Sequence, residues 1–113
     1  MKNGVERRRD ARIPAGWPAF LMTSQGPISG VTEDISMGGI LILCSETIET
    51  ENEIEIVIRL AKDHEMPATV KKIWSDKLLA HDSIYNEIGF SFTKISAGDR
   101  QIIASQVAEY YPI

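Results

Sequence analysis

The sequence is poor in the residues that disulfide-bonded, membrane-spanning and metal-binding proteins need. Cys44 is the single cysteine among 113 residues, so no intramolecular disulfide can form. No apolar run approaches the roughly 18 residues of a membrane-spanning helix, and charges interrupt the N-terminus where a signal peptide would have its apolar core. His64 and His81 lack a second histidine or cysteine at metal-ligand spacing. These absences predict a cytoplasmic protein without membrane insertion or a metal.

Recognisable catalytic motifs are missing as well. There is no G-x-S-x-G turn, no glycine-rich phosphate loop ending in Gly-Lys-Ser/Thr, no H-E-x-x-H, and no obvious general base beside Ser36. Cys44 and a distant histidine could formally act as a nucleophile and its base, but the only support for this pair is that both residue types are present. The sequence therefore predicts a protein that is not an enzyme and that has no cofactor.

Basic charge is scarce except at the N-terminus. Residues 1–12 hold five of the twelve Lys and Arg residues and two acidic residues, so this segment carries +3 while the rest of the chain carries −7. An acidic body disfavours binding to a nucleic acid polymer or an anionic membrane, which reward basic charge spread over a face. Residues 1–12 show no helical or strand periodicity, and we predict that they form a flexible basic arm ahead of one folded domain, 13–113.

Short apolar segments separated by turn residues fill most of this domain. In Glu53–Leu60, for example, isoleucines alternate with charged residues, as in a strand with one buried face. Several such strands without intervening helices predict an antiparallel barrel or sandwich. The expected strands are Ala19–Thr23, Ile28–Ile35, Gly39–Leu43, Glu53–Leu60, Ala68–Ser75 and Ile88–Thr93, with a polar stretch from Asp76 to Asn86 before the last of them.

The period changes near the C-terminus. Ser96 with Asp99 three residues later resembles a helix-capping box. Ile103, Val107 and Tyr110 then fall on one helical face, and Pro112 ends the pattern. We expect one amphipathic helix that packs against the sheet.

Two short motifs carry the chemistry of this chain. Arg8-Arg9-Asp10-Ala11-Arg12 supplies guanidinium groups, and Asp34-Ile35-Ser36-Met37-Gly38-Gly39 supplies a carboxylate, a hydroxyl and two positions without side chains. Arginine binds phosphate or the O6/N7 edge of guanine through two parallel hydrogen bonds, and a carboxylate accepts from base N–H groups. Together they suit a guanine nucleotide.

These motifs resemble the signature of the PilZ domain family of bacterial cyclic di-GMP receptors, which is R-x-x-x-R followed by [D/N]-x-S-x-x-G. The resemblance continues through Val70–Trp74, Ile88–Phe92 and the Ser96–Tyr111 helix. It implies a six-stranded antiparallel β-barrel with a C-terminal α-helix and a flexible N-terminal arm. It also implies a cytoplasmic second-messenger receptor that regulates motility, biofilm or exopolysaccharide through an unidentified downstream protein partner.

The resemblance implies a role for each motif residue. Arg8 and Arg12 would be the principal ligand arginines, and Asp34 and Ser36 would bind one guanine. Gly39, with Gly38, would let the backbone approach the flat base of the ligand without a Cβ in the way, or would permit positive φ after the turn.

An arginine just before the motif resembles the receptors that take cyclic di-GMP as a mutually intercalated pair. We therefore hypothesise two ligand molecules per chain, with Arg7 holding the second, and an arm that wraps over the ligand.

Each motif alone has a plainer explanation. The arginines could form a solvated tail, and Asp34-Ile35-Ser36 could be a turn whose side chains bind local backbone groups. Trp17 and Trp74 are predicted to be mainly structural, with Trp74 a candidate pocket edge, and residues 46–53 a solvated loop. The alternative functions are a PilZ-type protein-interaction adaptor that does not bind nucleotide, and an RNA- or DNA-binding barrel.

Overall fold

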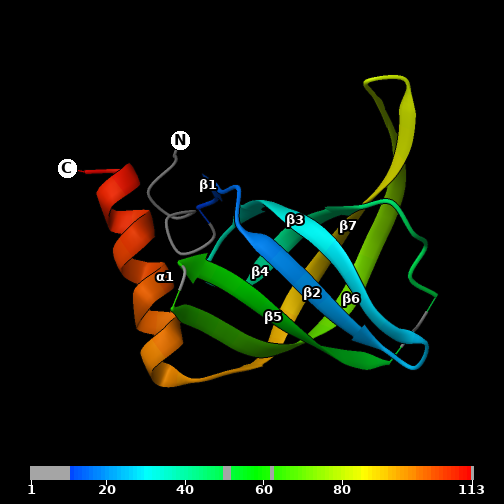
Figure 1. Cartoon of the computed structure of the whole chain (residues 1–113). Coiled ribbons are helices and arrows are strands. Elements are labelled where there is room, and N and C mark those ends of the chain that lie inside the picture. The colour runs from blue at the N-terminus through cyan, green and yellow to red at the C-terminus, as the bar shows by residue number, and fades with distance from the viewer. Residues whose placement is uncertain (1–10, 50–51, 62, 113) are drawn as a thin grey trace.

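Six antiparallel strands close into a barrel in the computed structural model, which describes residues 11–49, 52–61 and 63–112 (Figure 1). They are β2 (Pro18–Thr23), β3 (Gly26–Ile35), β4 (Gly39–Cys44), β5 (Glu53–Ala61), β6 (His64–Ala80) and β7 (Ser83–Ile95). They run in the order β3-β2-β5-β6-β7-β4, and the β3–β4 pairing closes the ring. A seventh strand, β1 (Ile13–Pro14), pairs with the end of β3. The predicted barrel is therefore confirmed.

Aliphatic side chains of alternate residues fill the barrel. Along β5, Ile56 and Ile58 are buried while Glu55 and Arg59 are exposed, which is the alternation expected of a half-buried strand. Each fully buried side chain of this kind contributes about 1.5–3 kcal/mol through removal of apolar area from water. The best-buried members of the core are Leu21, Ile35, Ile40, Ile42, Ile56, Ile58, Met66, Val70, Ile88 and Ile103.

Two bulges interrupt the alternation on one wall of the barrel. In β3 the register against β4 shifts between Thr32 and Asp34, so Thr32 and Ile35 both point inward and the two acidic residues between them share the outer face. In β6 the register against β7 shifts between Lys72 and Trp74, and Ile73 and Trp74 are both exposed. As a result, the side chains of Glu33, Asp34, Ile73 and Trp74 all lie on the outer face. Strict alternation would place two of these four side chains inside the barrel.

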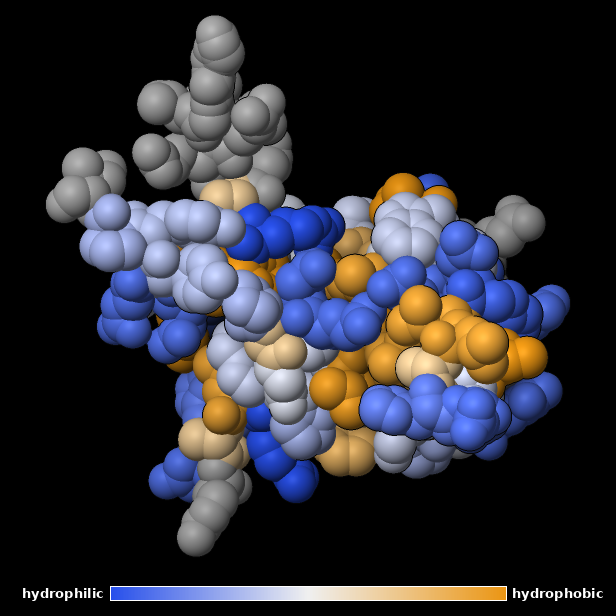
Figure 2. Space-filling model, turned by 90° about the horizontal axis from the view of Figure 1, so that it is seen from above, coloured by the Kyte–Doolittle hydropathy of each residue, from blue (hydrophilic) through white to orange (hydrophobic). Residues whose placement is uncertain are grey.

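The polar stretch from Asp76 to Asn86, which was not among the expected strands, is the outer half of a long hairpin formed by β6 and β7. His81 and Asp82 both have positive φ and connect Ala80 to its partner Ser83 in a two-residue turn. Leu79 and Ile84 lie opposite each other near the tip and are 73% and 65% exposed. The hairpin projects beyond the barrel (Figure 1), and Figure 2 shows apolar side chains gathered on this side of the molecule.

Helix α1 (Ala97–Tyr110) lies at one end of the barrel, away from the β2–β3 turn (Figure 1). As predicted, Ser96 caps it by accepting a hydrogen bond from the Asp99 amide at 3.0 Å. The helix buries Ile103 and partly buries Val107, but Tyr110, which was expected on the same face, is 54% exposed. It packs edge to face on Tyr111 at a ring distance of 4.9 Å. The apolar face is therefore shorter than the periodicity suggested.

Within the segment predicted to be a solvated loop, Ile48 is instead buried in the core, and its carbonyl oxygen accepts a hydrogen bond from Lys72 Nζ at 3.0 Å. Cys44 is buried. Burial raises the pKa of its thiol.

Candidate ligand-binding site

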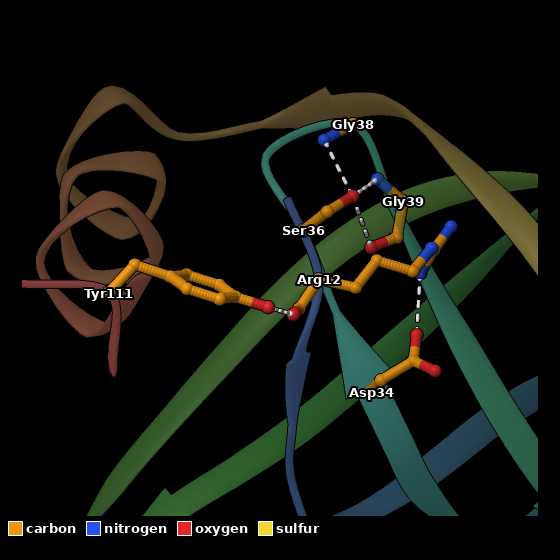
Figure 3. A network of polar contacts seen from close by, with 6 residues as sticks. All are labelled: Arg12, Asp34, Ser36, Gly38, Gly39 and Tyr111. Carbon is orange, nitrogen blue, oxygen red and sulfur yellow. Dashed lines mark hydrogen bonds and ion pairs between the residues drawn. The ribbon is translucent and has the colours of Figure 1, made fainter. Parts of the chain in front are cut away.

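The serine motif forms a tight turn between β3 and β4. Ser36 Oγ accepts hydrogen bonds from the amides of Gly38 at 3.3 Å and Gly39 at 3.2 Å and donates to the Gly39 carbonyl at 3.4 Å (Figure 3). The Ser36 amide donates to the same carbonyl at 2.9 Å. The hydroxyl is buried and holds the turn together, which is the local role that serine often has in turns. Asp34 has no such local role, because its carboxylate reaches the other motif.

Gly39 is required by strand packing. A Cβ at this position would lie 2.4 Å from the backbone carbonyl oxygen of Phe90, so β4 could not approach β7 as closely with any other residue. Gly38 differs, because a Cβ there would meet nothing within 4 Å, and its φ is not in the left-handed region. Gly39 is therefore needed for the packing of β4 against β7, and neither Gly38 nor Gly39 has a positive φ. The approach of a ligand base to this glycine stays a prediction.

Arg12 joins the first motif to the second. Strand β1 pairs Ile13 with Ile35 and Pro14 with Asp34, which brings the end of the basic arm beside the turn. Arg12 Nη1 then donates to Asp34 Oδ1 at 2.6 Å (Figure 3). The Arg12 and Asp34 side chains keep 47% and 27% of their area exposed. The predicted contacts of Arg7 and Arg8 lie outside the described residues.

A hollow of about 300 Å³ lies beside this pair on the outer wall of the barrel. Its lining comes from the two motifs and from the middle of the β6–β7 ribbon: Arg12, Ser36, Gly38, Gly39, Ile73, Trp74, Gly89, Phe90 and Ser91. Asp34, Leu41, Gly89 and Trp74 form one row of partners across four strands. At about 4.8 Å per strand, this row is roughly 14 Å wide.

Trp74 forms the far wall of the hollow. Its indole lies over Gly89 so closely that a Cβ on this glycine would be 2.3 Å from the indole Nε1. Nearly half of the Trp74 side chain remains exposed. From the sequence, Trp74 was predicted to be mainly structural and was also a candidate for the edge of a pocket. The bulge at Ile73, which the sequence did not predict, turns the Trp74 side chain outward.

The sequence matches the PilZ domain family over residues 6–109, which is nearly the whole chain and includes both motifs. The chain belongs to the PilZ domain family. A comparison with curated protein sequences gave no significant match.

Solved structures share the PilZ fold at low sequence identity. They include the PilZ domain of YcgR from Escherichia coli with c-di-GMP (12% identity, TM-score 0.70, 88% of this chain and 87% of that one). The MrkH–c-di-GMP complex of K. pneumonia gives 14% identity and a TM-score of 0.75 over 89% of this chain and 51% of that one. The inhibitor of motility MotI/DgrA of Bacillus subtilis gives 16% identity and a TM-score of 0.72 over 88% of this chain and 49% of that one. This PilZ chain thus spans about half the length of the last two, and identities this low show the fold alone.

Neither a metal site nor a membrane span was found in the described part of this PilZ chain. Residues 11–49, 52–61 and 63–112 contain no group of three or more His, Cys, Asp or Glu side chains that could hold a metal ion. Over the same ranges, no helix has the length and apolar character needed to cross a membrane.

An acidic pair lies next to the candidate site and was not found from the sequence. Glu33, the bulge residue of β3, lies close to Glu87 of β7 on the outer wall. Burial, a hydrogen bond between the two carboxyl groups, and repulsion from Glu87 and Asp34 raise the pKa of Glu33 to about 7. Near neutral pH the Glu33 carboxyl is therefore partly protonated, so it adds less negative charge beside Asp34 than an ordinary glutamate would.

This pair predicts a pH dependence of stability. The pKa of Glu33 is higher in the folded than in the unfolded chain, so its contribution is complete below pH 4.5 and is lost as the pH rises through about 7. We expect the unfolding free energy to fall by about 1 kcal/mol from pH 5 to pH 8, allowing for the water that reaches the pair. Glu33→Gln, which cannot ionise, should remove this fall.

Urea denaturation at pH 5, 6, 7 and 8 checks the expectation. Glu55→Gln is the control, because Glu55 is an exposed glutamate of β5 on another part of the barrel. An equal pH dependence in Glu33→Gln and the unmodified chain would show that the Glu33 carboxyl keeps an ordinary pKa.

Proposed function

We propose that this PilZ domain is a non-catalytic receptor for cyclic di-GMP, working in the cytoplasm. The observation that carries the proposal is the hollow on the barrel wall, where Arg12, the serine turn and Trp74 converge although they are distant in sequence. A cavity of about 300 Å³ lies at the lower end of small-molecule sites, so it suits one base and its phosphate, with the rest of the ligand spread over the outer wall.

The residue types match the parts of this ligand. Arg12 offers a guanidinium fork for a phosphate oxygen or for the O6/N7 edge of guanine, and Asp34 offers carboxylate oxygens for the N1–H and N2–H₂ donors. The Trp74 indole offers a flat face on which a base can stack, worth about 1–3 kcal/mol in comparable sites. Ser36 acts through the turn, which it holds in shape.

Ligand binding must compete with the contact between Arg12 and Asp34. Both residues are needed for the ligand, yet each is the partner of the other at 2.6 Å. The pair is partly exposed, and such pairs contribute only about 0–1 kcal/mol, so the ligand can separate them at little cost. Until then, the pair keeps both charged groups at the entrance of the hollow.

We assign the rest of the site to residues 1–12, treated as a flexible arm attached to the folded domain 13–113. In this proposal Arg8 completes the R-x-x-x-R motif with Arg12, and Arg7 holds a second cyclic di-GMP intercalated with the first. The arm folds over the ligand on binding and changes the surface that a downstream protein meets. The response would be in motility, biofilm or exopolysaccharide.

A PilZ-type adaptor that binds no nucleotide is the second candidate. The exposed pair Leu79 and Ile84 at the hairpin tip favours it, because apolar side chains this exposed often mark contacts with other proteins. The two functions differ in whether cyclic di-GMP binds at all.

Tryptophan fluorescence tests the proposal. We expect a saturable change on addition of cyclic di-GMP, and no comparable change with GTP or a random oligonucleotide. Trp74→Phe should remove most of the signal, whereas Trp17→Phe, which changes a tryptophan outside the hollow, should keep it. No binding of cyclic di-GMP by the unmodified chain would favour the adaptor.

Calorimetry distinguishes one ligand from two. The intercalated pair predicts two molecules of cyclic di-GMP per chain, reduced to one in Arg7→Ala. One molecule per unmodified chain at saturation would rule out the pair while leaving the receptor proposal in place.

A further inference from the structure

Helix α1 contacts both motif segments, although it contributes nothing to the lining of the hollow. Tyr111, the residue that caps its C-terminus, donates from its hydroxyl to the backbone carbonyl of Arg12 at 2.6 Å (Figure 3). Near the other end of the helix, Arg100 Nη1 lies 3.5 Å from the carbonyl oxygen of Met37, inside the serine turn. The contact at Arg12 is the shorter and better placed of the two.

The Tyr111 hydroxyl holds a backbone group directly attached to a proposed ligand residue. The Arg12 carbonyl belongs to the peptide that leads into β1, where Ile13 is buried and pairs with Ile35. The Tyr111 hydrogen bond fixes the orientation of this same peptide from the helix side (Figure 3). Two independent contacts therefore fix the point from which the Arg12 side chain extends toward Asp34.

A contribution to stability does not by itself explain the position of Tyr111. Its side chain is 39% exposed, and it is not part of the buried core. Its ring already packs edge to face on Tyr110, a contact that phenylalanine would keep. What only tyrosine provides here is the hydroxyl, and the hydroxyl binds Arg12.

We infer that Tyr111 is a positioning residue for ligand binding, which directs the Arg12 guanidinium into the hollow by holding the Arg12 peptide from helix α1. The inference rests on the proposed cyclic di-GMP site and adds a residue that touches neither motif side chain nor ligand.

Tyr111→Phe and Tyr110→Phe form a matched pair, since each removes one hydroxyl from adjacent half-exposed rings. For cyclic di-GMP we expect Tyr111→Phe to raise the Kd about fivefold, the effect of one lost hydrogen bond, and Tyr110→Phe to leave it unchanged. Both variants should unfold at nearly the same temperature as the unmodified chain. In an Arg12→Ala background Tyr111→Phe should have no further effect, because the side chain that it positions is gone.

A readout that needs no ligand is the NMR signal of the Arg12 side-chain Nε–H. Tyr111→Phe should shift it toward the position of a free arginine, and Tyr110→Phe should not. An unchanged Arg12 signal in Tyr111→Phe, or an equal loss of affinity with and without Arg12, would overturn the inference. If the unmodified chain binds no cyclic di-GMP while the Arg12 signal still responds to Tyr111, the proposed function fails and the positioning role stands.

Discussion

Replacing Arg12 by alanine should weaken the binding of cyclic di-GMP about 10- to 100-fold, the usual effect of losing one charged bidentate contact of about 1–3 kcal/mol. Arg12 lines the hollow and forms a 2.6 Å contact with Asp34, so its guanidinium lies at the site proposed for the ligand. Arg12→Lys should give an intermediate loss, because lysine keeps the charge but not the planar fork. Isothermal calorimetry at fixed ionic strength measures both effects.

Arg59→Ala is the control for Arg12→Ala. Arg59 also forms an exposed ion pair, with Glu65 at 2.8 Å, and its side chain is 45% exposed, close to the 47% of Arg12. It lies on β5, outside the hollow. Its loss should leave the affinity for cyclic di-GMP unchanged. Equal affinities in Arg12→Ala and Arg59→Ala would remove Arg12 from the site.

Replacing Gly39 by alanine should destabilise the fold by about 2–3 kcal/mol, as expected when an atom is forced into a closely packed region. The new Cβ would lie 2.4 Å from the Phe90 carbonyl oxygen, and neither strand can yield without breaking the β4–β7 pairing. The hollow should widen as well, because Gly39 and Phe90 both line it. Urea denaturation measures the loss of stability, and calorimetry measures the accompanying loss of affinity.

Gly38→Ala provides the matched control one residue away. Space around Gly38 is open, and its backbone suits any residue, so alanine there should change stability by less than about 0.5 kcal/mol, as at most surface positions. If Gly38→Ala and Gly39→Ala had the same effect, the close approach of β4 to β7 would not be the reason for glycine at position 39.

The barrel was predictable from the sequence because most strands have a strong local pattern. In Glu53–Leu60, isoleucines alternate with charged residues, and the structure places them inside and outside as expected. The outer half of the β6–β7 hairpin lacks such a pattern, since its apolar residues are exposed and lie among polar ones. Its turn depends on positive φ at His81 and Asp82, residue types that do not signal this conformation as strongly as Asn-Gly does.

The site could be predicted only in part, since its motif residues are local in sequence and its remaining residues are not. The sequence placed Arg12, Asp34 and the serine turn together through the motif. Trp74 and Glu33 reach the outer wall through bulges, and a bulge appears only when the partner strand and its register are known. The roles of Ser36 within the turn and of Tyr111 against Arg12 likewise depend on contacts that have no sequence pattern.

The central claim is that cyclic di-GMP binds on the barrel wall between Arg12 and Trp74, and the most direct test is a map of amide and indole NMR shifts during titration. The proposal predicts that signals of the serine turn and of the Trp74 indole shift together and saturate with one affinity. Signals of the β2–β3 turn at Thr23–Gly26, at the other end of the barrel, should stay in place (Figure 1). Shifts confined to that distant end, or none at all, would contradict the assignment of the site.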